Sequence, residues 1–188
     1  MNRKTLLFIV AVLASAALSA HANLVVNPGF ETGTFSGWTN SGDTSFTAVS
    51  DSTFGHTPHS GTYEAHFGPT SSDGFLDQNV TTTPGQFYIM DFWLSNDDPI
   101  ANNHMSASFN GTTFLTLVNA PAFPYTHYTS GPIMATGALS DVHFTFYNPP
   151  AYYYLDDVAV NPVPEPGTLG LIALGAFGLV GTLRKRLV

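Results

Sequence analysis

The 188-residue sequence predicts an all-β domain, an antiparallel β-sandwich, between two apolar terminal segments. Phe, Tyr, Thr and Val are frequent, and Gly, Pro, Asn, Ser and Asp interrupt them about every 8–12 residues, the spacing of short strands and turns. Between the terminal segments, no stretch keeps a helical period of about 3.6 residues. Asn110-Gly111 joins two strand-like runs, which is a strong hairpin signal. Many short strands separated by turns favour a sandwich or a barrel.

The N-terminal segment, residues 1–22, has the order of a secretory signal peptide. Arg3-Lys4 precedes the apolar run Leu6–Leu18, and Ala20-His21-Ala22 supplies the small residues that a signal peptidase reads. We therefore expect a signal helix that is cleaved before Asn23. A first membrane helix is the alternative, although the run is shorter than the roughly 17–25 residues that cross a bilayer.

Residues 23–161 form one predicted domain. Its clearest strand is Gln86–Ser95, where apolar residues lie on both faces, as in a central strand. The predicted strands are Leu24–Val26, Gly37–Asn40, Ser45–Ser50, Tyr63–Phe67, Gly74–Val80, Gln86–Ser95, His104–Asn110, Thr112–Val118, Tyr125–Met134, Asp141–Asn148 and Tyr152–Val160.

The charge of the chain is divided unevenly. All five Lys and Arg residues lie in the terminal segments, so the domain carries only acidic charge and histidines. Because phosphate contacts need cations, this composition excludes nucleic-acid binding. A buried carboxylate of the domain requires backbone N–H groups, a raised pKa or a metal ion. The chain has no cysteine, so the exported domain must depend on its core, or on a metal, for stability.

The C-terminal segment, residues 162–188, combines a proline motif, an apolar run and a basic tail. Pro164-Glu165-Pro166 is followed by Gly167–Leu183, about 17 residues without charge, and then by Arg184-Lys185-Arg186. This order predicts a single transmembrane helix over residues 167–183 with its basic residues, 184–186, in the cytoplasm. An ordinary C-terminal anchor is one interpretation of the segment.

The same order resembles the PEP-CTERM sorting signal of Gram-negative bacteria. The resemblance implies a temporary inner-membrane tether that an exosortase recognises and removes. It also implies that the protein is exported to the cell surface or extracellular matrix, where such proteins associate with exopolysaccharide or biofilm.

A second resemblance covers nearly the whole domain. It rests on six motifs in order: Asn23-Leu-Val-Val-Asn-Pro-Gly-Phe-Glu31, Gly37-Trp38, His59-Ser-Gly-Thr-Tyr63, Leu76-Asp-Gln78, Pro84-Gly-Gln-Phe-Tyr88 and Tyr154-Leu-Asp-Asp-Val-Ala-Val160. Together they are similar to the galactose-binding-like jelly rolls, the β-sandwich of many carbohydrate-binding modules. The resemblance implies a jelly-roll fold and leaves the ligand open, because function varies widely within this fold.

Three acidic residues are candidates for a structural calcium site. In jelly rolls of this type a Ca²⁺ ion often joins the first and last strands, which would place Glu31 and Asp156 in the site with backbone oxygens of the His59–Gly61 region. Asp157 is a further candidate, although neighbours on a regular strand point to opposite faces. In the alternative, the carboxylates accept backbone N–H groups at an edge without metal. The preceding Asn27-Pro28-Gly29 predicts a turn in which Gly29 is free to adopt a positive φ.

Four aromatic residues are candidates for stacking on a sugar ring: Trp93, Tyr125, Tyr152 and Tyr153. Each could instead pack in the core. Because side chains alternate along a strand, at least one ring of Tyr152-Tyr153-Tyr154 must face away from the core.

The sequence offers little for catalysis. It has no Gly-x-Ser-x-Gly elbow and no cysteine nucleophile. We expect Asp97-Asp98 to be solvated, and His56, His59 and His66 to be surface residues rather than zinc ligands. We therefore predict a non-catalytic surface or matrix protein that associates with glycan. The alternatives are a purely structural matrix protein without a specific ligand and a small extracytoplasmic hydrolase.

Overall fold

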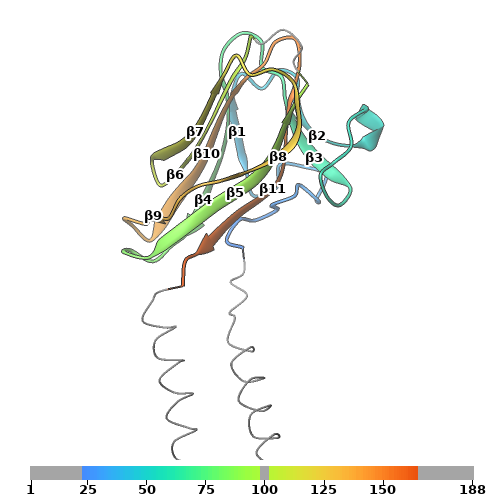
Figure 1. The fold of residues 1–188 in the computed structure, drawn as a ribbon. Helices are drawn as coiled ribbons and strands as arrows, with labels where there is room; N and C mark the ends of the chain where they lie inside the picture. The colour runs from blue at the N-terminus through green and yellow to red at the C-terminus, as the bar shows by residue number, and fades with distance from the viewer. Residues whose placement is uncertain (1–22, 98–101, 165–188) are drawn as a thin grey trace, which may run out of the picture. The chain divides into compact units, whose positions relative to one another are not determined.

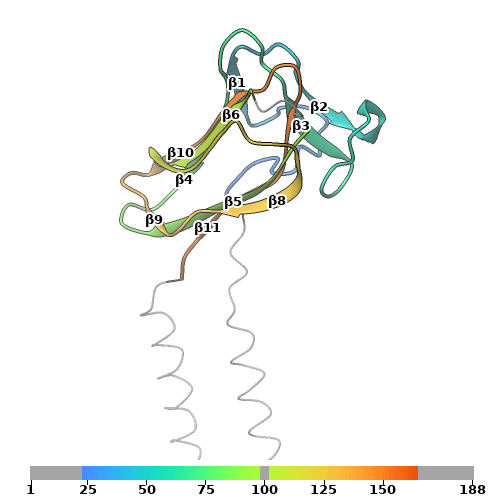
Figure 2. The same cartoon turned by 45° about the horizontal axis from the view of Figure 1, so that its top comes forward.

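The computed structural model describes residues 23–97 and 102–164, which form two packed antiparallel sheets (Figures 1 and 2). One sheet has the order β1-β4-β10-β6-β7, and the second has the order β2-β3-β11-β5-β8, with β9 paired to β5. The predicted all-β antiparallel sandwich is confirmed. The predicted signal helix and transmembrane helix lie outside the described residues, and within these residues no helix is long and apolar enough to cross a membrane.

The strands are short and occur at regular intervals along the chain. Their bounds are β1 Thr39–Gly42, β2 Thr47–Asp51, β3 Tyr63–Phe67, β4 Gly74–Thr81, β5 Phe87–Asn96, β6 His104–Phe109, β7 Thr112–Val118, β8 Phe123–Thr129, β9 Ile133–Met134, β10 Leu139–Tyr147 and β11 Tyr153–Pro162, and a single 3-10 turn, η1, covers Ser52–Phe54.

The β6–β7 hairpin forms where the sequence predicts it. Asn110 and Gly111 have φ values of 48° and 69°, so both central residues are in the left-handed region. A two-residue type I′ turn requires this conformation, and Asn-Gly adopts it at little cost.

Two predicted strands are wrong. Leu24–Val26 is not a strand, because the Gln78 side chain replaces a neighbouring strand: its Oε1 accepts the N–H of Val26 at 2.7 Å and its Nε2 donates to the Val26 carbonyl at 3.0 Å. Tyr125–Met134 is divided into β8 and β9. Between them, the Ser130 hydroxyl accepts the N–H of Met90 at 2.9 Å, so a side chain takes the place of a strand contact.

The core lies between the two sheets. In β5, the alternate residues Tyr88, Met90, Phe92 and Leu94 are buried against it, as the predicted central strand requires. The intervening residues, among them Trp93, therefore point away from the core. We call this other side of the second sheet the outer face; it carries Glu64 and His66 from β3, Tyr154 and Asp156 from β11, Ser95, Trp93 and Asp91 from β5, and Tyr125 and His127 from β8.

Candidate functional site

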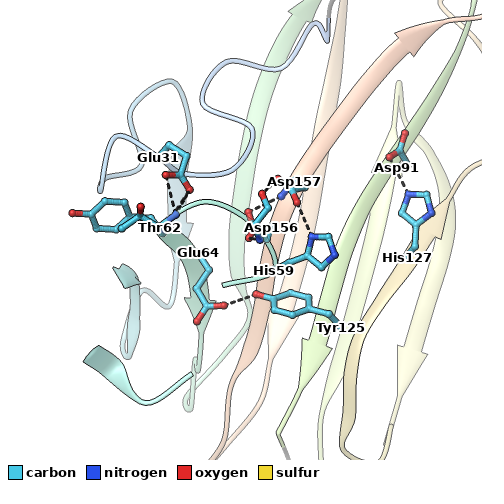
Figure 3. Close-up of polar contacts among 11 residues, drawn as sticks. Glu31, His59, Thr62, Glu64, Asp91, Tyr125, His127, Asp156 and Asp157 are labelled. Carbon is cyan, nitrogen blue, oxygen red and sulfur yellow. Dashed lines mark hydrogen bonds and ion pairs between the residues drawn. The ribbon is translucent and has the colours of Figure 1, made fainter. Parts of the chain in front are cut away.

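Glu31, Asp156 and Asp157 converge on the short segment Ser60–Tyr63, which leads into β3 (Figure 3). We call this group the carboxylate junction. Segments that are far apart in sequence meet there, because β11 pairs with β3 and Glu31 lies in the chain before β1. The junction thus joins the beginning and the end of the domain.

Glu31 binds backbone N–H groups. Its two carboxylate oxygens accept the N–H of Thr62 at 3.0 and 3.1 Å, and Oε1 also accepts that of Tyr63 at 3.1 Å. The adjacent Gly61 is left-handed, with φ of 62°, and a Cβ there would collide with the Glu31 carboxylate. Glycine is therefore needed at position 61 for both its conformation and its size.

The turn before Glu31 differs from the prediction. The left-handed residues are Asn27 and Phe30, with φ of 53° and 57°, and Gly29 is not among them. A Cβ on Gly29 would lie 3.3 Å from a carboxylate oxygen of Asp156 and 3.3 Å from one of Asp157. Close approach of the carboxylates, rather than a positive φ, explains this glycine.

Asp156 and Asp157 do not point to opposite faces, so the prediction from regular alternation is wrong. The register of β11 against β5 shifts between Asp156 and Ala159, and Asp157 is left-handed with φ of 49°. This bulge turns both side chains towards Ser60: its N–H donates to Asp156 Oδ2 at 3.1 Å, and its hydroxyl donates to Asp157 Oδ1 at 2.7 Å.

Asp156 is the buried member of the junction. Its side chain is fully buried and accepts the N–H groups of Ser60 and Asp157. Burial raises its pKa from 3.8 to about 7, because the charged form loses its hydration. Residues 23–164 contain no Lys or Arg that could compensate this charge.

The donor set of the junction suits a hard cation, but the carboxylates alone do not complete a site. Within the described residues, no group of three or more His, Cys, Asp or Glu side chains is arranged to hold a metal. Backbone carbonyls would have to supply the remaining ligands, as calcium sites commonly allow. The carboxylates of Glu31 and Asp156 accept backbone N–H groups here, so the two alternatives from the sequence both stay open.

Gly61→Ala is expected to destabilise the domain in two ways, through a left-handed alanine and through collision of its Cβ with the Glu31 carboxylate. Gly111→Ala is the matched control, because Gly111 has φ of 69° and nothing within 4 Å of an added Cβ. Both variants should lose the roughly 1–2 kcal/mol of a left-handed alanine. Gly61→Ala should lose about 1–3 kcal/mol more, since the Glu31 carboxylate must move. Urea unfolding measures the difference, and equal losses would contradict the tight contact at Gly61.

Rings cover the outer face of the second sheet. His66 on β3, Tyr154 on β11, Trp93 on β5 and Tyr125 on β8 extend across four neighbouring strands. Carboxylates lie between them; Figure 3 shows Asp157 bonded to His59 and Asp91 bonded to His127, at 2.7 and 3.0 Å. The face thus combines flat rings with hydrogen-bond acceptors.

Three further rings come from the segment Ser52–Ser60, between β2 and β3, which lies on this face. Phe54 stacks on His66 with centroids 4.2 Å apart, His56 stacks on Tyr154 at 3.7 Å, and His59 stacks on Trp93 at 3.8 Å. The paired rings are within 15° of parallel in all three stacks. We call this segment the ring cover.

The four predicted stacking residues have different positions. Trp93, Tyr125 and Tyr152 are half-buried members of the ring network on the outer face. Tyr153 is fully buried, and its hydroxyl donates to Asn103 Oδ1 at 2.6 Å. Tyr153 therefore belongs to the core, and the structure removes it from the candidate set.

Glu64 is a central residue that the sequence did not indicate. Its carboxylate is fully buried, each oxygen lies 2.9 Å from His56 Nδ1, and Oε2 accepts the hydroxyl of Tyr125. Burial and the adjacent Glu64 raise the pKa of Tyr125, so its hydroxyl stays protonated and donates. A Glu between apolar residues in a strand gives no sign that a loop will cover it.

Three side chains on the outer face, Ser95, His56 and Glu64, follow the order of the serine, histidine and acid of a hydrolytic triad. The Ser95 hydroxyl lies 3.3 Å from His56 Nε2, and the opposite nitrogen of the same ring contacts Glu64. Ser95 is only 2 % exposed, and it lies beside the ring cover, so a substrate does not reach its hydroxyl in this conformation. Asp97 is exposed, as predicted, and it also accepts the N–H of Tyr152 at 2.7 Å; Asp98 lies outside the described residues.

The sorting motif is confirmed by comparison with known families. Residues 162–186 match the family described as the PEP-CTERM protein-sorting motif. The match covers the C-terminal segment and overlaps the sandwich only at Pro162, the last residue of β11, and Val163. No curated protein matches the chain.

Several solved structures similar to the domain are carbohydrate-binding modules. TmCBM61 in complex with β-1,4-galactotriose matches with a TM-score of 0.62 and 22% identity, over 76% of this chain and 99% of that chain. The CBM22-1 xylan-binding domain of Paenibacillus barcinonensis Xyn10C matches with a TM-score of 0.54 and 15% identity, over 79% and 99%. A family 16 carbohydrate-binding module matches with a TM-score of 0.52 and 18% identity, over 73% and 99%. At these identities the likeness establishes the sandwich fold.

Proposed function

We propose that residues 23–163 form a non-catalytic glycan-binding module, which PEP-CTERM sorting delivers to the exterior of a Gram-negative cell. The observation that carries this proposal is the outer face, where rings extend across four strands with carboxylates between them. Sugar rings stack on flat aromatic surfaces, and their hydroxyl groups donate to carboxylates. The similarity of the fold to modules that bind galactotriose and xylan supports the same assignment.

The ligand that suits this face is a neutral polysaccharide. The domain has no Lys or Arg, and in the described residues the ion pairs join a histidine to a carboxylate. An acidic polysaccharide would meet like charge, which opposes its approach. Neutral chains avoid this repulsion and retain the stacking contacts.

In this proposal the two terminal segments direct the export of the protein and its release from the membrane. Signal peptidase removes residues 1–22, and the C-terminal segment then holds the protein transiently in the inner membrane. An exosortase processes that segment and releases the domain to the cell surface or matrix. There it associates with exopolysaccharide and contributes to a biofilm.

A structural calcium ion at the carboxylate junction belongs to the same proposal. Glu31 and Asp156 would hold it with backbone oxygens, and Asp157 lies beside them as a further ligand. The support is the fully buried Asp156 carboxylate, which has no Lys or Arg partner. A divalent cation would supply the missing positive charge and would fix the first and last segments of the domain to each other.

Titration of the domain with neutral glycans tests the binding function. We expect galactan or xylan oligosaccharides to bind by isothermal titration calorimetry, and Trp93→Ala to weaken binding at least about tenfold, or about 1.4 kcal/mol. Tyr147→Ala is the matched control, because Tyr147 also stacks on a histidine, His104, but belongs to β10 in the other sheet. Alginate, an acidic polysaccharide, should bind more weakly than the neutral chains.

Two outcomes would favour the alternatives. If no neutral glycan gives a heat of binding in the calorimeter, the result would support a purely structural matrix protein without a specific ligand. Hydrolysis of an ester or glycoside that disappears in Ser95→Ala or Asp97→Ala would support a small hydrolase and contradict the non-catalytic assignment.

A further inference from the structure

We propose that the ring cover, Ser52–Ser60, occupies the glycan site and must move aside before a ligand can bind; this inference rests on the proposed function. It concerns how the outer face is regulated, and it assigns a role to three rings that lie outside the sheet. The rings of the cover stand where sugar rings would otherwise stack.

The stacking geometry is the first support. Phe54, His56 and His59 lie on His66, Tyr154 and Trp93 at 3.7–4.2 Å, which is van der Waals contact between ring faces. The three acceptor rings belong to three different strands, β3, β11 and β5. Three stacked pairs in one short segment cover the surface that a glycan chain would need.

The attachment of the cover is the second support. Within the described residues, residues 52–59 make one backbone–backbone hydrogen bond, from the Gly55 N–H to the Ser52 carbonyl at 3.2 Å, and none of this kind joins them to the sheet. Residues 52–59 contact the sheet through side chains, His56 with Glu64 and Ser95, and His59 with Asp157. Ser60, at the end of the cover, also donates its backbone N–H to Asp156. Side-chain contacts can be exchanged for those of a ligand without breaking a strand pairing.

Two glycines, Gly55 inside the cover and Gly61 directly after it, are suited to a change of backbone conformation. Gly55 is left-handed, with φ of 101° and nothing within 4 Å of an added Cβ, and Gly61 follows the cover with φ of 62°. Phe54 remains 45 % exposed although it stacks on His66. Glycines within and next to a segment with few backbone contacts can absorb the changes in φ and ψ that its movement requires.

The double variant Phe54→Ala/His59→Ala tests this inference and leaves the His56–Glu64 contact in place. A site that is partly closed binds with an apparent affinity reduced by its open fraction. We therefore expect the double variant to bind the neutral glycan of the calorimetric experiment about tenfold more tightly than the natural sequence. Phe46→Ala is the control, because Phe46 is an exposed ring, 63 % accessible, outside the cover. Unchanged or weaker binding by the double variant would contradict the proposal that the cover blocks the site. Weaker binding would also indicate that the rings of the cover contribute to glycan binding.

A second measurement does not depend on glycan binding. The chain has two tryptophans, so Trp38→Phe leaves Trp93 as the only fluorophore of this kind. In that background, acrylamide should quench Trp93 several-fold more strongly when Phe54 and His59 are alanine. Equal quenching would contradict the cover by itself. If quenching rises but neither protein binds a glycan, the result confirms that the cover shields Trp93 and contradicts the proposed glycan-binding function.

Discussion

Removal of calcium is expected to lower the melting temperature of residues 23–163, and Glu31→Gln or Asp156→Asn should abolish the difference. A ligand that binds only the folded state stabilises it by about 4.1 kcal/mol when its free concentration is 1,000 times Kd. For a domain of this size the shift is on the order of 10 °C. Differential scanning calorimetry in CaCl₂ and in EDTA measures it. The amide variants retain side-chain size, so a loss of the calcium effect is not a consequence of a new cavity.

The pH dependence of stability gives the same prediction a second readout. The pKa of Asp156 is raised from 3.8 to about 7 in the folded domain. Between these values the folded state holds a proton that the unfolded state has released, so stability falls as pH rises from about 4 to 7. In EDTA we expect this fall. Calcium should remove most of it, because the cation stabilises the carboxylate, and Asp156→Asn should show neither effect.

Asp73→Asn is the control for these experiments. Asp73 is an acidic residue outside the carboxylate junction: it pairs with His104, on β6 in the other sheet, at 2.8 Å. It should keep the full response to calcium. A melting temperature that is the same in CaCl₂ and EDTA would contradict the calcium proposal and favour the alternative in which backbone N–H groups alone bind the carboxylates.

The regular part of the fold follows from local sequence signals. The alternation in β5 predicts its buried residues, and Asn110-Gly111 predicts its hairpin, because both depend on neighbours in the chain. The predicted strand at Leu24–Val26 fails for a different reason. Its partner is the side chain of Gln78, which reaches Val26 from β4, and no local pattern reveals such a contact.

The candidate site could be predicted only in part. Glu31 and Asp156 were found through motif order, and they do meet at one segment. Regular alternation along a strand predicts that Asp157 points away from Asp156. This prediction fails because β11 contains a bulge, for which the local sequence gives no signal beyond the pair of aspartates. Glu64 and the ring cover were missed, since a loop that folds back on a sheet depends on long-range contacts. We expected His56, His59 and His66 to be surface residues, but His66 is buried. The stacking of all three histidines on other rings has no signal in their spacing.

Substitution of Pro164-Glu165-Pro166 by three alanines is expected to leave the domain folded and to prevent most of its release. The sorting motif that matches residues 162–186 contains these residues. The domain makes its last contacts just before them: the Val163 N–H donates to the Phe87 carbonyl at 2.8 Å, and Gln86 Nε2 donates to the Val163 carbonyl at 2.6 Å. Pro164 is exposed, and Glu165 and Pro166 lie outside the described residues.

The measurement compares the variant with the natural sequence in the native host by immunoblot of membrane and extracellular fractions. The unprocessed form should accumulate in the membrane fraction, while the melting temperature of the purified domain stays unchanged. Glycan binding by the retained protein should also be normal, because the substitution changes no residue of the outer face, which is formed by β3, β11, β5 and β8. Release at the natural level would show that sorting does not depend on this motif. Loss of folding instead would mean that the domain extends beyond Val163, in conflict with the compact unit Asn23–Val163.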